Sequence, residues 1–184
     1  MYGLVNKAIK EMMIQEYGTN GWQAICEAVD LENDHFINLQ PYPDELTYQM
    51  VTAAACYANQ PVPDILKAFG HHWIKYTGQN GYGDMLNLGG HDLPTFLSNL
   101  DRMHAGMSHA YPELRPPSFR CETLSPNKLR LHYQSEREGL PPFVIGLLEG
   151  LGEYLNTPLR VDHSGPCDLD QNCEVFHIDL LEEA

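Results

Sequence analysis

The first part of the chain carries apolar residues at intervals of three and four, the spacing of one face of an α-helix. Gly18 stands where the first such stretch would end, and Asn20 precedes a second, shorter one. Further helices are expected from Asp44 to Tyr57 and from Pro63 onward. The pattern therefore predicts a helical N-terminal lobe of about residues 1–62. The helix that follows it has an apolar face made by Ile65, Leu66, Phe69, Trp73 and Tyr76.

The next helix is expected to carry a histidine on its apolar face. Asp92 followed by Pro94 is typical of a helix start, with the aspartate as the cap. His104 comes four residues after Leu100 and three before Met107, so it shares their face. A buried imidazole is costly unless its ring nitrogens find partners. A hydrogen-bonded core histidine is the commoner explanation, and an axial ligand of haem iron is the functional one.

After Pro117 the apolar period changes from helical to two, the period of a strand. Pro141-Pro142 opens one more helix within this region. Helices first and strands afterwards predict an α+β fold, with an antiparallel sheet and helices in a C-terminal lobe of about residues 63–184. The expected strands are Ser118 to Thr123, Lys128 to Arg137, Leu159 to His163 and Glu174 to Leu180.

The second of these strands places three polar side chains in a row. Tyr133, Ser135 and Arg137 alternate with Gln134 and Glu136 and so share one face of the strand. Arginine offers a charged fork to a carboxylate, and the two hydroxyls can donate to its remaining lone pairs. A solvated strand face is the alternative, although the leucines that precede these residues on the same face oppose it. The row indicates a site for carboxylates.

Composition narrows the classes of partner. The chain has 184 residues with 25 Asp and Glu against 11 Lys and Arg, a formal charge of −14. Such an acidic chain is poorly suited to nucleic acid or to an anionic membrane surface. No signal peptide or membrane-spanning run is expected, and five cysteines at irregular spacing give no disulfide framework. We therefore expect a cytoplasmic protein.

Taken together, these residues resemble the haem-nitric oxide/oxygen binding (H-NOX) family, which includes the haem domain of soluble guanylate cyclase. The tyrosine-x-serine-x-arginine motif matches Tyr133, Ser135 and Arg137, about thirty residues after His104. The resemblance extends over essentially the whole chain. Its other segments are Met1-Tyr2-Gly3-Leu4-Val5-Asn6, Ala68-Phe69-Gly70, Asn99-Leu100-Asp101-Arg102-Met103-His104, Leu114-Arg115-Pro116-Pro117-Ser118-Phe119 and Gly146-Leu147-Leu148-Glu149-Gly150-Leu151.

The resemblance implies a ferrous haem b buried between two lobes, in a sensor without catalytic turnover. His104 would ligate the iron, the motif would hold the haem propionates, and Pro117 would press on the porphyrin and distort it. An ordinary loop proline is the alternative for Pro117. The partner implied is a histidine kinase or a cyclic-di-GMP enzyme. The expected pocket walls are Leu4, Val5, Trp73 and Val144.

Pro142 bears on which gas would bind. Oxygen-binding relatives carry a distal tyrosine five residues after the motif arginine, where this chain has Pro142. Bound oxygen needs a hydrogen-bond donor, whereas nitric oxide binds ferrous iron without one. Nitric oxide and carbon monoxide are therefore expected over oxygen, although the Trp73 indole is a donor near the expected pocket. The expected signal is release of His104 and flattening of the haem against Pro117.

His163, Cys167, Cys173 and His177 form a second candidate metal site near the C-terminus. Two thiolates and two imidazoles suit tetrahedral zinc, but the spacing matches no standard zinc finger. Free cysteines or a labile Cys167–Cys173 disulfide are the alternatives. Two other functions stay open, besides an oxygen-binding haem sensor: a thiol or zinc redox sensor built on this hairpin, and a peroxidase using His71 and His72. Helical spacing turns these two histidines away from the apolar face.

Overall fold

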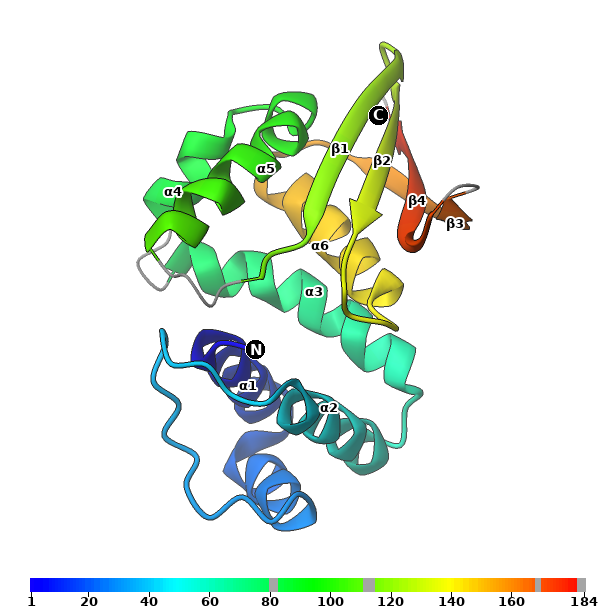
Figure 1. Ribbon diagram of the computed structural model, residues 1–184. Helices are drawn as coiled ribbons and strands as arrows, with labels where there is room; N and C mark the ends of the chain where they lie inside the picture. Colours follow the sequence, from blue (N-terminus) through cyan, green and yellow to red (C-terminus); the bar gives the residue numbers. More distant parts are fainter. Residues whose placement is uncertain (80–82, 111–114, 168–169, 182–184) are drawn as a thin grey trace.

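The computed structural model describes residues 1–79, 83–110, 115–167 and 170–181. It confirms the α+β fold, with helices first and a sheet in the C-terminal half (Figure 1). The helices are α1 (Gly3–Ala28), α2 (Asp44–Ala58), α3 (Val62–Gln79), α4 (Gly83–Gly89), α5 (Leu93–Ala110) and α6 (Pro141–Tyr154). The strands are β1 (Ser118–Ser125), β2 (Lys128–Gln134), β3 (Leu159–Cys167) and β4 (Asp170–Leu180).

Helix α1 combines the two N-terminal helices that the sequence predicts. Gly18 does not end the helix; it lies inside it with φ 71° and ψ −179°, a conformation that glycine adopts without strain from a side chain. The chain then continues as helix, and Trp22 and Ile25 join the same hydrophobic cluster as Ile9 and Met13. The glycine therefore changes the direction of α1, so that both of its segments cover one core.

The sheet has the strand order β1-β2-β4-β3, and all neighbouring strands are antiparallel. The period-two pattern is confirmed on β2, where Leu129, Leu131 and Tyr133 are buried and the residues between them are more exposed. However, β2 ends at Gln134, three residues earlier than predicted. The Ser135 N–H still donates to the Asn172 carbonyl at 3.1 Å, and Arg137 lies in the connection to α6.

Two hydrophobic clusters form the interior, and α3 contributes to both of them. Ile65, Leu66 and Phe69 belong to a cluster with α1 and α2, while Ile74 belongs to one with α5, α6 and the sheet. In Figure 1, α1 and α2 lie on one side of α3, and the sheet, α4 and α5 lie on the other. The two halves of the molecule therefore meet along this helix.

Glycines bring α3 and α6 unusually close together. A Cβ atom on Gly70 would lie 2.1 Å from the Phe143 carbonyl oxygen, and one on Gly146 would lie 1.9 Å from the Lys67 carbonyl oxygen. A Lys67–Glu149 ion pair and a contact between His71 Nε2 and Glu153 Oε1, at 2.9 Å each, accompany this close packing. Close packing of α3 on α6 fixes the positions of the side chains that both helices direct into the cavity described below.

Other expectations differ in part from the structure or lie outside what it describes. The break expected at Gly78 to Gly83 is shorter, because α4 begins at Gly83; residues 80–82 are outside the described part of the chain. Tyr111 and Pro112, expected to end α5, also lie outside it. None of the helices in the described part of the chain combines the length and the apolar character that crossing a membrane requires.

Candidate functional site

A cavity of about 350 Å³ lies between the two halves of the molecule. Side chains from α1, α2, α3, α5 and α6 line it, together with the segment 115–117 and the end of β2. Every residue that the sequence assigned to cofactor binding is on this lining. They are Leu4, Val5, Trp73, His104, Pro117, Tyr133, Ser135, Arg137 and Val144.

His104 reaches the cavity from the last turns of α5, with its ring packed against Phe119 at 5.7 Å between centroids. Burial holds the pKa of His104 below its usual value, although Asp101 and a hydrogen bond with the Pro117 backbone act in the opposite direction. A neutral imidazole keeps a lone pair on one ring nitrogen, which is the form that ligates a metal.

Asp101 fastens this part of α5 to the start of β1. One carboxylate oxygen accepts the Phe119 N–H at 2.5 Å, and the other accepts the Ser118 hydroxyl at 3.0 Å. Asp101 precedes His104 by three residues, so both lie on neighbouring turns of the helix. The turns of α5 that carry His104 and the first residues of β1 are therefore held as one unit.

The three motif residues gather at one end of the cavity. Burial raises the pKa of the Tyr133 hydroxyl, and its hydrogen bond with Ser135 acts in the opposite direction. The Ser135 hydroxyl oxygen also accepts the Arg137 N–H at 3.0 Å. Although Ser135 and Arg137 lie beyond the end of β2, this local turn returns them to the cavity. The arrangement presents two hydroxyls and a guanidinium, as the sequence predicts.

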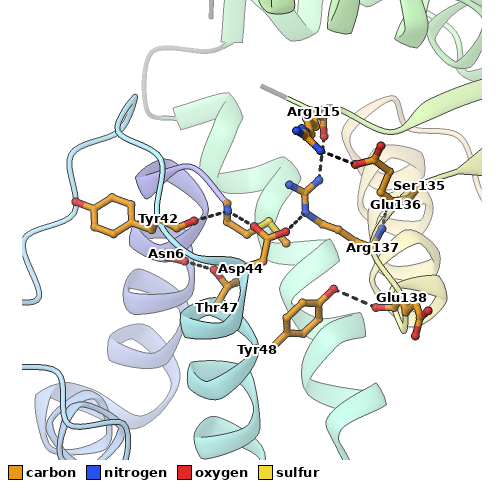
Figure 2. Close-up of polar contacts among 11 residues, drawn as sticks. Asn6, Tyr42, Asp44, Thr47, Tyr48, Arg115, Ser135, Glu136, Arg137 and Glu138 are labelled. Atoms are coloured by element: carbon orange, nitrogen blue, oxygen red, sulfur yellow. Dashed lines mark hydrogen bonds and ion pairs between the residues drawn. The ribbon is translucent and has the colours of Figure 1, made fainter. Parts of the chain in front are cut away.

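Asp44, which the sequence did not single out, orients the Arg137 side chain (Figure 2). Its Oδ2 accepts from Arg137 Nε at 2.8 Å, and its Oδ1 pairs with the Met1 amine. Partial burial would raise the pKa of Asp44, but the hydrogen bonds from Met1 and Arg137 outweigh this effect and lower it. Arg137 Nη1 donates to the Arg115 carbonyl at 2.9 Å, and the remaining guanidinium N–H groups stay available to a ligand.

Apolar and aromatic side chains form another part of the cavity lining. Phe69 lies 5.1 Å from Phe143 and 6.1 Å from Trp73, measured between ring centroids. Val144 follows Phe143 into the cavity, whereas Pro142 in the first turn of α6 is not on its lining. Phe69 was predicted only as a core residue and Phe143 was not predicted, because helical spacing identifies an apolar face but not what it faces.

Two hydroxyl groups on the lining donate their hydrogens away from the cavity. The Thr47 hydroxyl donates to Asn6 Oδ1 at 2.7 Å, and the Tyr48 hydroxyl donates to the Glu138 carbonyl at 3.1 Å. Thr47 and Asn6 are both buried, so this hydrogen bond is shielded from water. Figure 2 shows the Thr47 and Tyr48 side chains on the α1 and α2 side of Arg137.

The four predicted zinc ligands do not come together in this structure. Cys167 and Cys173 form a disulfide, and His163 instead pairs with Glu174 at 2.7 Å and stacks on Phe176. Among the described residues, the group able to hold a metal ion is Cys167, Cys173 and His132, whose Nδ1 lies 3.7 Å from Cys167 Sγ. His132 was missed because β2 is distant in sequence and only the sheet register brings it to the hairpin.

His71 and His72 are not on the cavity lining, as their helical spacing predicts. His71 pairs with Glu153 on α6, and the His72 ring lies 6.0 Å from that of Tyr76. A peroxidase needs an acid–base pair beside the bound peroxide. These two histidines do not provide one.

The residues on this cavity fit haem. A neutral imidazole suits the iron, the apolar and aromatic walls suit the porphyrin, and the hydroxyls and guanidinium suit carboxylates. The assignment rests on one observation: the imidazole, the apolar and aromatic walls and the carboxylate-binding groups all line the same cavity. Separate pockets for His104 and Arg137 would have excluded it.

Comparison with known proteins agrees with this chemistry. The profile of the family described as Haem-NO-binding matches residues 2–163. Soluble guanylate cyclase gcy-35 of Caenorhabditis elegans is 30% identical over 156 residues, which are 80% of this chain and 22% of that protein. Soluble guanylate cyclase 89Db of Drosophila melanogaster is 27% identical over 146 residues, 79% of this chain and 22% of that protein. The chain thus spans about a fifth of the length of these curated relatives.

Solved structures share the fold over the whole chain. An H-NOX protein from S. oneidensis in the Fe(II)NO ligation state superposes with a TM-score of 0.88 at 20% identity, covering 99% of this chain and all of the other. A mutant of the S. oneidensis protein in the Fe(II) state gives a TM-score of 0.89 at 19% identity, covering 100% and 98%. At this identity the likeness concerns the fold.

Proposed function

The chain belongs to the haem-NO-binding (H-NOX) family of haem gas sensors, and we propose that it binds nitric oxide and carbon monoxide at ferrous haem b while discriminating against oxygen. The proposal rests on the observation that His104, Tyr133, Ser135 and Arg137 line the same apolar cavity. We propose a cytoplasmic signalling module without catalytic turnover of its own.

His104 would be the axial ligand, and Tyr133, Ser135 and Arg137 would hold the two carboxylates. When bound, the haem supplies a ferrous iron that takes a diatomic gas on the face opposite His104. Asp44 holds the Arg137 guanidinium in one orientation, which lowers the entropy lost when a carboxylate binds. Pro117 lines the same cavity, and its rigid ring suits it to press on a planar ligand.

The lining of the cavity supports nitric oxide and carbon monoxide over oxygen. Thr47 and Tyr48 direct their hydroxyl hydrogens to Asn6 and Glu138, so neither offers a donor to a bound gas. Phe143 and Val144 occupy the part of α6 nearest the cavity. Because bound oxygen depends on a donor and nitric oxide does not, this part of the wall favours nitric oxide, and the Trp73 indole is the donor on the lining that acts in the opposite direction.

Release of His104 is the proposed signal. Asp101 ties the turns of α5 that carry His104 to the start of β1. A change in the position of the imidazole would therefore move α5 and the start of the sheet together. Both are regions from which a signalling partner can read two states. A histidine kinase or a cyclic-di-GMP enzyme is the partner that we propose.

The absorbance spectrum of the purified ferrous protein tests the proposed ligand. We expect a haem band that shifts with nitric oxide and with carbon monoxide and does not change in air-saturated buffer over the mixing time. Trp73→Phe is the matched variant, because the indole is the donor that would favour an oxygen sensor. A stable oxygen complex that disappears in Trp73→Phe would contradict the proposed selectivity.

The signal is tested with His104→Gly supplied with free imidazole, which replaces the ligand without its link to α5. We expect this variant to load haem and bind nitric oxide but to lose its effect on the partner. The ferrous wild type, measured with and without nitric oxide in the same assay, is the control. Unchanged signalling by the variant would contradict a mechanism that depends on movement of α5.

A thiol sensor is the second candidate, and the Cys167–Cys173 disulfide with His132 beside it is the observation that favours it. The reduced pair with His132 also retains the chemistry of a zinc site, in place of the predicted set with His163 and His177. Metal analysis of the reduced protein separates these cases. Stoichiometric zinc without haem would favour this candidate over the gas sensor.

A further inference from the structure

We infer that Arg115 is a second carboxylate-binding residue of the cavity, one that the tyrosine-x-serine-x-arginine motif does not include. Arg115 and Arg137 are the lysine or arginine side chains on the described part of the lining. A ligand with two carboxylates is matched in charge by two guanidinium groups. The inference rests on the proposed function, because that ligand is the haem.

Contacts in the structure hold the two arginines together at one end of the cavity. The Arg115 carbonyl accepts from Arg137 Nη1 at 2.9 Å, and Ser135 joins Arg137 at 3.0 Å (Figure 2). Pro116 and Pro117 follow Arg115, and two consecutive prolines restrict the backbone on which its side chain is mounted. The position of Arg115 beside the motif is therefore fixed by main-chain contacts, while its side chain is largely exposed.

The two guanidinium groups differ in how firmly they are held. Arg137 is bonded to Asp44, and its side chain is 21% exposed. Arg115 pairs with Glu136 at 3.2 Å, but the two side chains are 76% and 75% exposed. Such an exposed ion pair contributes little, about 0–1 kcal/mol, so a carboxylate of a bound ligand can replace Glu136 with little loss.

The chemistry assigns different tasks to these residues. Arg137 is held in one orientation by Asp44, whereas Arg115 is held by an exposed ion pair that a carboxylate of the ligand can replace. In a chain of charge −14, a dianionic ligand is repelled by the protein as a whole, so each local cation matters to its retention. Arg115 should therefore act mainly on the rate of ligand loss.

Transfer of haem from the loaded protein to excess apomyoglobin measures this rate. We expect Arg115→Gln to lose ferric haem roughly three to ten times faster than the wild type, and Arg115→Lys to lie between them. The difference should shrink in 1 M salt, because screening weakens exposed charge pairs. The apo proteins should unfold at midpoints within about 2 °C of each other, since only an exposed ion pair is removed.

Two controls separate binding of a carboxylate from a structural role. Haem dimethyl ester lacks charged carboxylates, so wild type and Arg115→Gln should lose it at the same rate. Glu136→Gln removes the partner of Arg115 but keeps the guanidinium, and it should not speed the loss of haem. Equal loss rates for wild type and Arg115→Gln, or a Glu136→Gln rate as fast as that of Arg115→Gln, would overturn the inference. Failure of the wild type to take up haem would overturn the proposed function as well.

Discussion

At the scale of single residues, the neutral state of His104 decides whether it can act as a ligand. Burial disfavours the imidazolium, while Asp101 and the Pro117 backbone partly compensate. The lowered pKa has a second consequence, because in the unfolded chain the same imidazole takes up a proton near its ordinary value of about 6.5. Proton binding is therefore linked to folding at this residue.

Stability of the apo protein should fall with acidification. Below about pH 6.5 the unfolded chain binds more protons at His104 than the folded chain does, so the free energy of unfolding decreases as pH drops toward the lowered folded pKa. Burial also lowers the pKa of His72, which acts with the same sign. Urea unfolding between pH 7.5 and 5.5 measures the slope. His104→Leu should make it shallower; an unaltered slope would show that His104 contributes nothing to it.

The sequence alone identified functional residues where a polar side chain interrupts the apolar face of a predicted helix or strand. A histidine on an apolar stripe and a tyrosine, serine and arginine at period two predicted His104 and the motif on the cavity. Asp44, Arg115 and His132 were not found, since each is an unremarkable polar residue until the fold places it. His163 shows the reverse case, since its register partner Phe176 and Glu174 draw it away from the two cysteines.

At the scale of elements, hydrophobic periodicity predicted the type of each long helix and strand but not every boundary. β2 ends early because Ser135 and Arg137 turn toward the cavity instead of extending the ladder. α4 was missed because seven residues are too few for a helical period to be recognised. Contacts between elements, such as the one between α3 and α6, have no signal in periodicity.

The α3–α6 contact can be tested with one methyl group. Gly146→Ala would place a Cβ 1.9 Å from a main-chain oxygen of α3, so the helices must separate. We expect a loss of about 1–3 kcal/mol in the free energy of unfolding, as for overpacked cores, together with weaker haem retention. Chemical unfolding and haem transfer measure the two effects.

Gly106→Ala is the matched control for this substitution. Gly106 lies in α5, and a Cβ there would meet nothing within 4 Å. It should stabilise the protein by up to about 1 kcal/mol through helix propensity. Equal effects of the two alanines would show that the α3–α6 contact is not as close as described.

At the scale of the whole molecule, polar contacts from α2 tie the described part of the helical half to the sheet half. Asp44 of α2 reaches Arg137, and Tyr48 of α2 reaches the Glu138 carbonyl, both in the β2–α6 connection. Apolar contacts also join the halves, through α3 in both clusters and through Leu140 and Phe143, which pack against the first of them. The division into lobes near residue 62 stays a prediction, because α3 belongs to both clusters.

Asp44→Asn tests how much the polar tie contributes. It keeps the shape of the side chain but removes the charge that pairs with Arg137 and the Met1 amine. We expect the apo protein to lose about 1–2 kcal/mol of unfolding free energy and the loaded protein to release haem faster. Asp162→Asn, which removes an exposed pair with Arg160, should change stability by less than about 0.5 kcal/mol. Equal effects of the two asparagines would contradict a special role for Asp44.

The position of α3 in both clusters also limits how this molecule can be recombined. A chimaera joined in the turn before Val62 would pair α1 and α2 of one homologue with the α3 of another, and the cluster around Phe69 would have to be repacked. A junction after α3 would instead disturb the glycine contact with α6. We therefore expect that gas preference can be exchanged between homologues only when α3 is transferred together with α1 and α2 on one side and α6 on the other. The whole cavity then comes from one homologue.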